Sequence, residues 1–106
     1  MLTHLKKEHD LNKILKHQKK SKEGITLLFT SLWDAPSQRL LQKLENQYGE
    51  EPIEGGEPLY VLNSFDMPHS FVIFNTTVTP HLVHIERKSV KSFDYLPYVY
   101  RRLGLG

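Results

Sequence analysis

The most constraining feature of this 106-residue chain is a short, nearly continuous apolar run from Ile25 to Leu32. The run reads Ile-Thr-Leu-Leu-Phe-Thr-Ser-Leu and is rich in residues that favour β-strands. A strand that is apolar on both faces needs cover on both faces, as the central strands of α/β sheets have. The run therefore predicts a central strand in a sheet with helices on both sides.

An amphipathic helix is predicted on each side of this strand in the sequence. Before the strand, Leu11, Ile14 and Leu15 share one helical face, lysines occupy the other, and Asp10 is placed to cap the first turn. After the strand, apolar side chains recur with helical period up to a stop at Gly49, at Leu40, Leu41, Leu44 and Tyr48.

Further strands are predicted in the second half of the chain. Pro58 opens a buried strand over 59–62, a third strand covers 82–85, and a short fourth covers 89–91 after a turn near 86–88. Pro68 suits the start of a helix, whereas the segment 71–74 would serve equally as a strand, and both interpretations stay open.

The last predicted element is a helix that starts at Ser92 or Asp94 and ends at Gly104. Pro97 is compatible with it only in the first turn. The alternating order predicts one α/β domain over residues 1–106, in which residues 1–23 form a basic, amphipathic helical segment packed on the rest.

The absence of cysteine excludes disulfides, thiolate metal sites and thiol nucleophiles. No apolar stretch approaches the roughly 20 residues of a membrane span, and no signal-peptide pattern follows the N-terminal lysines. We therefore expect a cytoplasmic protein without membrane association. No cofactor is expected, and no metal site, since His81 and His84 are three apart in a strand and face opposite sides.

Charge is uneven along the chain, because residues 1–23 hold seven lysines against three acids. These lysines could bind nucleic acid or an acidic partner, but no aromatic residues lie among them for base stacking, so a solvated helix face is favoured. An acidic stretch around Gly55-Gly56 reads as a solvated loop that lacks the spacing of a calcium site, with carboxylates at Glu50, Glu51, Glu54 and Glu57.

The segment from Ile25 through Trp33-Asp34-Ala35-Pro36-Ser37 and into the following helix resembles the thioredoxin family. In that family a buried strand leads to Trp-Cys-Gly-Pro-Cys and a helix. A second similarity is Thr79-Pro80, which follows the strand-end Asn63 at a spacing like that of the family's cis-proline. The resemblance covers roughly residues 25–103 and implies a central mixed sheet of four to five strands flanked by about four helices, with a cis Thr79–Pro80 bond.

The same resemblance implies that dithiol chemistry has been lost. Asp34 and Ser37 stand where the family has its two cysteines, and Leu28 and Val61 stand where it has a buried acid and a lysine. Thiol exchange needs a thiolate and groups that manage its proton, and all are missing here. We expect a redox-inactive chain.

Roles for the individual residues remain open between structure and function. Asp34 is expected to cap the helix through the N–H groups of its first turn, with a general base or nucleophile beside Ser37 as the alternative. Trp33 is expected at the rim of a groove, with core packing as its alternative. His81 could line that groove, although a surface position on its strand is the more usual outcome.

The leading interpretation is a non-enzymatic binding module that holds a protein or an extended peptide in a groove. The groove would be formed by Trp33, Asp34, Ala35, Pro36, Ser37, Thr79, Pro80 and His81. An alternative is a glutathione-binding or transferase-like enzyme that uses Ser37 or Asp34. A further alternative is binding of nucleic acid or an acidic partner by the N-terminal helix, with nucleic acid disfavoured, and the oligomeric state stays open.

Overall fold

A computed structural model describes residues 2–48, 58–87 and 89–105 of the chain. Nine elements follow one another in these residues. They are β1 (Leu2–His4), α1 (Glu8–Lys20), β2 (Ile25–Thr30), α2 (Ala35–Gln47), β3 (Leu59–Asn63), α3 (Pro68–Ile73), β4 (His81–Glu86), β5 (Ser89–Phe93) and α4 (Leu96–Arg102). No described helix has the length and apolar character needed to cross a membrane.

The five strands form one mixed sheet in the order β1-β3-β2-β4-β5. β1, β3 and β2 run parallel, β4 is antiparallel to β2, and β5 is antiparallel to β4. The predicted central strand is thus confirmed as β2, which pairs with β3 on one side and β4 on the other.

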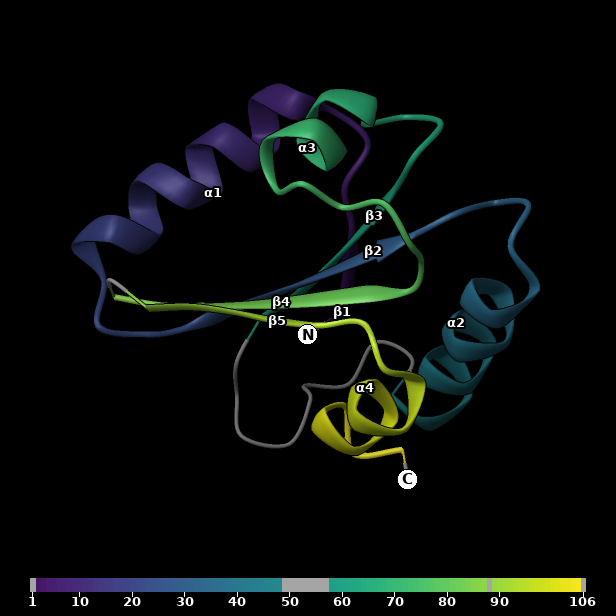
Figure 1. Cartoon of the computed structure of the whole chain (residues 1–106). Coiled ribbons are helices and arrows are strands. Elements are labelled where there is room, and N and C mark those ends of the chain that lie inside the picture. Colours follow the sequence, from purple (N-terminus) through teal and green to yellow (C-terminus); the bar gives the residue numbers. More distant parts are fainter. Residues whose placement is uncertain (1, 49–57, 88, 106) are drawn as a thin grey trace.

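Helices cover both faces of the sheet, with α1 and α3 on one and α2 and α4 on the other (Figure 1). Leu27 and Phe29 of β2 belong to the core cluster on the α1 and α3 side. Leu28 lies in the cluster that includes Leu40, Leu44 and Val99 of α2 and α4. The residues of β2 alternate between the two cores, which explains why its sequence is apolar almost throughout.

The first strand was not predicted. β1 has three residues, of which Thr3 and His4 are exposed, and a segment this short carries no readable alternation. The predicted cap of α1 was also wrong, because the helix begins at Glu8 with Lys7 as its N-cap and Asp10 lies inside the first turn. There its negative charge still suits the helix N-terminus.

The two ambiguous segments of the second half are now resolved. Pro68 starts helix α3, so the helical interpretation is correct, and Phe71 of this helix packs its ring edge-on to Phe29 at a centroid distance of 4.9 Å. The last helix begins later than predicted, at Leu96, because β5 continues to Phe93. Pro97 falls in the first turn as expected.

The helix ends and loops agree only in part with the prediction. Gly104 follows the last helix with a positive φ of 73°, as its role as a stop requires. Gly49 and the acidic stretch of 50–57 lie outside the described residues.

Candidate functional site

The two segments singled out in the sequence meet at one end of the sheet. The loop after β2 carries Trp33 and Asp34, and the turn before β4 carries Thr79 and Pro80. β4 is antiparallel to β2, with His81 opposite Phe29, so the end of β2 and the start of β4 lie side by side. The peptide bond between Thr79 and Pro80 is cis.

The carboxylate of Asp34 joins these segments. Its Oδ2 accepts one hydrogen bond from the Ser37 hydroxyl at 2.7 Å and another from the Thr79 hydroxyl at 2.7 Å. Asp34 does occupy the N-cap position of α2, but its side chain makes no capping hydrogen bond. The expected role as a cap for the backbone N–H groups is therefore wrong, and the carboxylate binds the two hydroxyls through Oδ2 instead.

These hydrogen bonds weigh against acyl-transfer or other nucleophilic chemistry at Ser37. The Ser37 side chain is fully buried and donates its proton to Asp34. Among the described residues, no histidine hydrogen-bonds either side chain. A nucleophilic serine needs a base that is oriented by a third group, and Asp34 here holds two hydroxyl donors on one oxygen instead.

An exposed aromatic pair lies beside this junction. Trp33 is 76% exposed, as expected, and its ring meets the ring of Phe65 at a centroid distance of 6.0 Å and an angle of 73°. Phe65 was not predicted for the site and is 66% exposed. It lies in the turn after β3, and the parallel strands β3 and β2 end on the same side of the sheet. Val78, also unpredicted, is half-exposed and precedes Thr79. We call Trp33, Phe65, Val78 and Thr79 the Trp33 surface.

The remaining predicted groove residues differ in exposure. Ala35 is exposed and Pro36 is half-buried, so both border the loop of Trp33. Pro80 is buried, and His81 is buried as well, so the expectation of a surface histidine was wrong. The reason is its place in β4, next to β2, where its ring points with Phe29 into the core at a centroid distance of 6.2 Å.

His81 is a buried polar group without a hydrogen bond in the described structure, since neither Nδ1 nor Nε2 has a partner there. Burial lowers the pKa of His81 below its ordinary value of 6.5, and the negative charge of Asp94 opposes part of this effect. The neutral ring is therefore the form that fits the folded protein.

Stability is expected to depend on His81 protonation. Because its pKa is lower in the folded state than in the unfolded state, the wild-type protein should lose stability as the pH falls below about 6.5. The His81→Leu variant lacks this contribution, so its free energy of unfolding should change less steeply, by up to about 1.4 kcal/mol per pH unit. Urea unfolding from pH 5 to 7.5 measures both slopes, and equal slopes would contradict the assignment.

Leu28 and Val61, at the positions where the thioredoxin family has its buried acid and lysine, are buried neighbours. They are 0% and 3% exposed, are register partners in β2 and β3, and belong to the same core cluster. Apolar side chains here avoid the large cost of burying two charges.

No protein-family model and no curated protein sequence matches this chain. Solved thioredoxins nevertheless superimpose on nearly all of it. The Fasciola hepatica thioredoxin gives a TM-score of 0.75 at 16% identity, covering 97% of this chain and 95% of its own. The chain has a thioredoxin-like fold.

Other thioredoxins give the same result at still lower identity. Thioredoxin NaTrxh from Nicotiana alata has a TM-score of 0.75 at 7% identity, over 95% of this chain and 88% of its own. Thioredoxin from Trypanosoma brucei brucei has a TM-score of 0.73 at 10% identity, over 96% and 86%. This thioredoxin-like chain has no cysteine, so dithiol exchange is not available to it.

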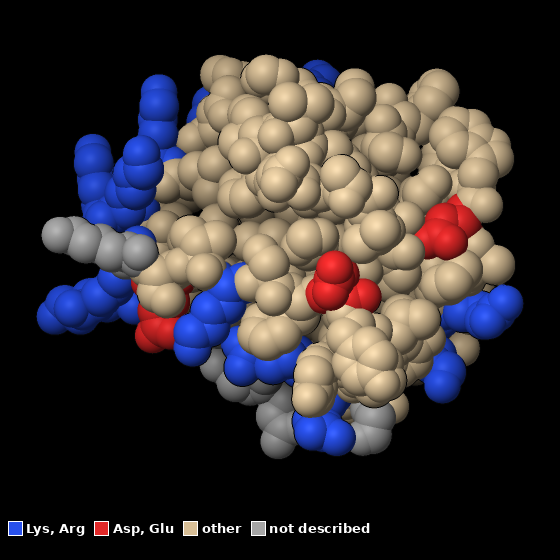
Figure 2. Space-filling view, in the orientation of Figure 1, with Lys and Arg blue, Asp and Glu red and all other residues tan. Residues whose placement is uncertain are grey.

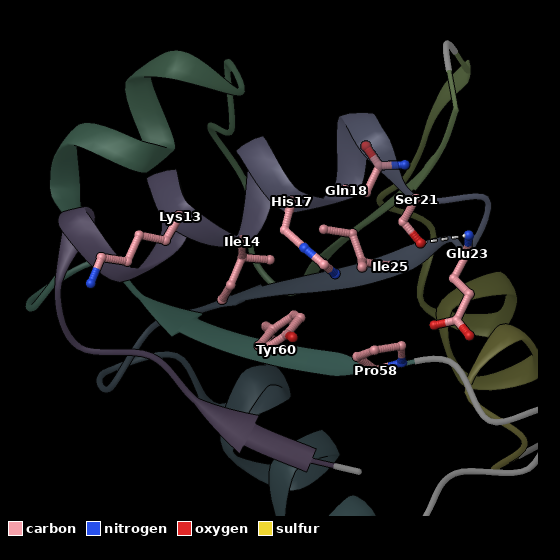
Figure 3. A pocket seen from close by; sticks show the side chains of 9 residues that line it. All are labelled: Lys13, Ile14, His17, Gln18, Ser21, Glu23, Ile25, Pro58 and Tyr60. Carbon is pink, nitrogen blue, oxygen red and sulfur yellow. Dashed lines mark hydrogen bonds between the residues drawn. The ribbon is translucent and has the colours of Figure 1, made fainter.

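Two of the hollows in the described part of the chain lie beside α1, away from the Trp33 surface. The first hollow has a volume of about 370 Å³ and lies between α1 and the starts of β2 and β3. Figure 3 shows Ile14 and His17 pointing from the helix toward Tyr60 and Pro58. The other is lined by cations from the end of α1 and the β4–β5 turn, namely Lys19, Lys20, Lys22 and Arg87, together with Ser21. Figure 2 shows lysine and arginine side chains gathered at that end of the molecule.

Proposed function

We propose that this chain is a non-catalytic, thioredoxin-like binding module whose Trp33 surface holds an extended peptide segment of a partner protein. The observation that carries the proposal is the exposed Trp33–Phe65 pair, which stands beside the cis Thr79–Pro80 bond. Aromatic residues contribute a large share of the binding energy at protein interfaces, and here two of them lie exposed and in contact with each other.

The backbone next to this pair favours an extended peptide as the ligand. Among the described residues, none hydrogen-bonds the backbone N–H or carbonyl of Val78 or Thr79, although the Thr79 side chain is held by Asp34. A peptide lying along this segment could pair with these groups, as strands do when they add to an exposed backbone. The rings of Trp33 and Phe65 would then receive its apolar side chains.

The proposal is tested with a displayed library of random peptides selected on the immobilised protein. Peptides that bind the wild type should lose about 30-fold in affinity with Trp33→Ala, and a comparable amount with Phe65→Ala, because an interfacial hot spot contributes about 2 kcal/mol or more. Isothermal titration calorimetry with the selected peptides measures the loss.

Val90→Ala is the matched control. Val90 is 60% exposed but lies on β5 opposite Ile85, at the other end of the sheet, so its removal should leave peptide affinity unchanged. Selected peptides that bind the Trp33→Ala and Phe65→Ala variants as tightly as the wild type would show that the Trp33 surface is not the binding site.

A further inference from the structure

The exposed side of α4 carries aromatic rings at its N-terminal end and cations in its last turn. Tyr95, at the N-cap of the helix, is 60% exposed and Tyr98 is 52% exposed. Arg101 and Arg102 occupy the last turn and are exposed. Cations are common in the last turn of a helix, but here both also lie beside aromatic rings.

The contacts between these side chains are specific. The rings of Tyr95 and Tyr98 meet edge to face at a centroid distance of 5.2 Å, and the guanidinium of Arg101 lies 5.8 Å from the centre of Tyr98. Arg102 lies 5.2 Å from the Phe93 ring, and the Lys43 ammonium lies 5.3 Å from Tyr100. Tyr100 is two residues from Tyr98 on the helix, so Lys43 lies on another side of α4. We call the set Phe93, Tyr95, Tyr98, Arg101 and Arg102 the α4 surface.

The cations of this surface have no acidic partner in the described structure. Neither Arg101 nor Arg102 forms an ion pair with a described carboxylate. In the segment 89–105, the cations Lys91, Arg101 and Arg102 face a single acid, Asp94. Blue side chains accordingly border the area of α4 in Figure 2. Within the described residues, the two arginine charges are therefore not offset by an ion pair, and such charges attract anions.

We propose that the α4 surface binds single-stranded nucleic acid with little sequence preference. Bases would stack on the exposed tyrosines, and Arg101 and Arg102 would contact the phosphates. The combination of exposed rings and adjacent cations is what such binding requires, because every base offers a face for stacking and every nucleotide a phosphate.

The rings favour nucleic acid over an acidic peptide as the occupant. An acidic peptide would use the cations but would leave the Tyr95 and Tyr98 rings without a function. The N-terminal lysines offer the reverse case, since they form a basic hollow with no aromatic residue in its lining. They therefore provide a charge-matched comparison within the same molecule.

Fluorescence anisotropy with a labelled oligothymidylate of about 12 nucleotides tests the proposal, since sites of this kind span about 4–16 nucleotides. Tyr98→Leu should weaken binding at least about fivefold, because a stacked base contributes about 1–3 kcal/mol. Tyr98→Phe keeps the ring and should bind within about twofold of the wild type. Circular dichroism melting verifies that both variants fold.

Salt dependence tests the cations separately. Changing Arg101 and Arg102 together to glutamine should reduce the slope of log affinity against log salt by about 1.4, at about 0.7 per phosphate contact. Changing Lys19 and Lys20 together removes the same charge from the basic hollow and should leave the slope unchanged. Trp33→Ala should also have no effect, so this proposal and the peptide-binding proposal succeed or fail independently.

Three results would overturn the proposal. The first is no binding of the oligonucleotide at low salt, and the second is equal binding by Tyr98→Leu and the wild type. The third is displacement of the oligonucleotide by polyglutamate when the carboxylates are as concentrated as the phosphates. That result would make the α4 surface a site for an acidic protein.

Discussion

Replacing Leu28 with aspartate is expected to lower the free energy of unfolding at pH 7 by at least about 4 kcal/mol. Leu28 is fully buried in the core beneath α2 and α4, so the variant loses apolar contacts and also buries a carboxylate without a partner. A small domain has only about 5–15 kcal/mol in total, which brings the variant close to unfolding. Urea unfolding followed by circular dichroism measures the loss.

The loss in Leu28→Asp should shrink as the pH is lowered. Burial raises the pKa of the introduced carboxyl in the folded state, so acidification neutralises it and restores stability between its folded pKa and the ordinary value of about 3.9. Leu28→Ala removes a similar volume without a charge and should cost about 2–5 kcal/mol with no such pH dependence. Parallel pH profiles of the two variants would contradict the expectation.

The neighbouring position offers a rescue experiment. Val61 is the register partner of Leu28 in β3 and lies in the same core cluster. Adding Val61→Lys to Leu28→Asp places opposite charges on adjacent strands, where the thioredoxin family has them. The double variant should lose about 1–3 kcal/mol less free energy of unfolding than the two single variants lose in total, because buried opposite charges that lie close together are coupled. A coupling energy near zero would mean that the two side chains do not meet.

Replacing Asp34 with alanine is expected to cost about 2 kcal/mol. The change removes the acceptor of two hydrogen bonds to a charged oxygen and leaves the buried Ser37 hydroxyl without its partner. Ser37→Ala and Thr79→Val, which each remove one donor, should cost about 1 kcal/mol each. Thermal unfolding of the three single variants and of the corresponding double variants measures these losses of stability.

Asp34→Asn serves as the matched control, because its amide oxygen can still accept from a hydroxyl but carries no charge. It should retain about half of the stability that Asp34→Ala loses. If Asp34→Ala and Thr79→Val together cost as much as the sum of the two single changes, the hydrogen bond between the loops contributes nothing to stability.

The regular parts of the fold could be predicted from the sequence because their side chains repeat with a clear period. The run at Ile25 gives the central strand, and the spacing from Leu40 to Tyr48 gives α2. The edge strand at Leu2 could not be predicted in this way, since it has three residues and takes its pairing from β3, which is more than 50 residues away in the chain.

The candidate site was predictable only where a motif marked it. Trp33 and Thr79-Pro80 stood out through their resemblance to the thioredoxin family, whereas Phe65 lies in a turn without a motif and joins Trp33 only because β3 and β2 end at the same edge. The role of Asp34 was missed for a related reason. Its position predicts a cap from local geometry, but the Thr79 hydroxyl that binds it comes from 45 residues further along the chain.

The bridge from Asp34 to Thr79 also bears on the thermodynamics of recognition. Because the two loops are already joined in the free protein, their conformational entropy is lost on folding and not on association. If the proposed Trp33 surface binds a ligand, the ligand meets these two loops already joined. Association should follow single-step kinetics, with no slow phase for loop ordering, and little change in backbone position.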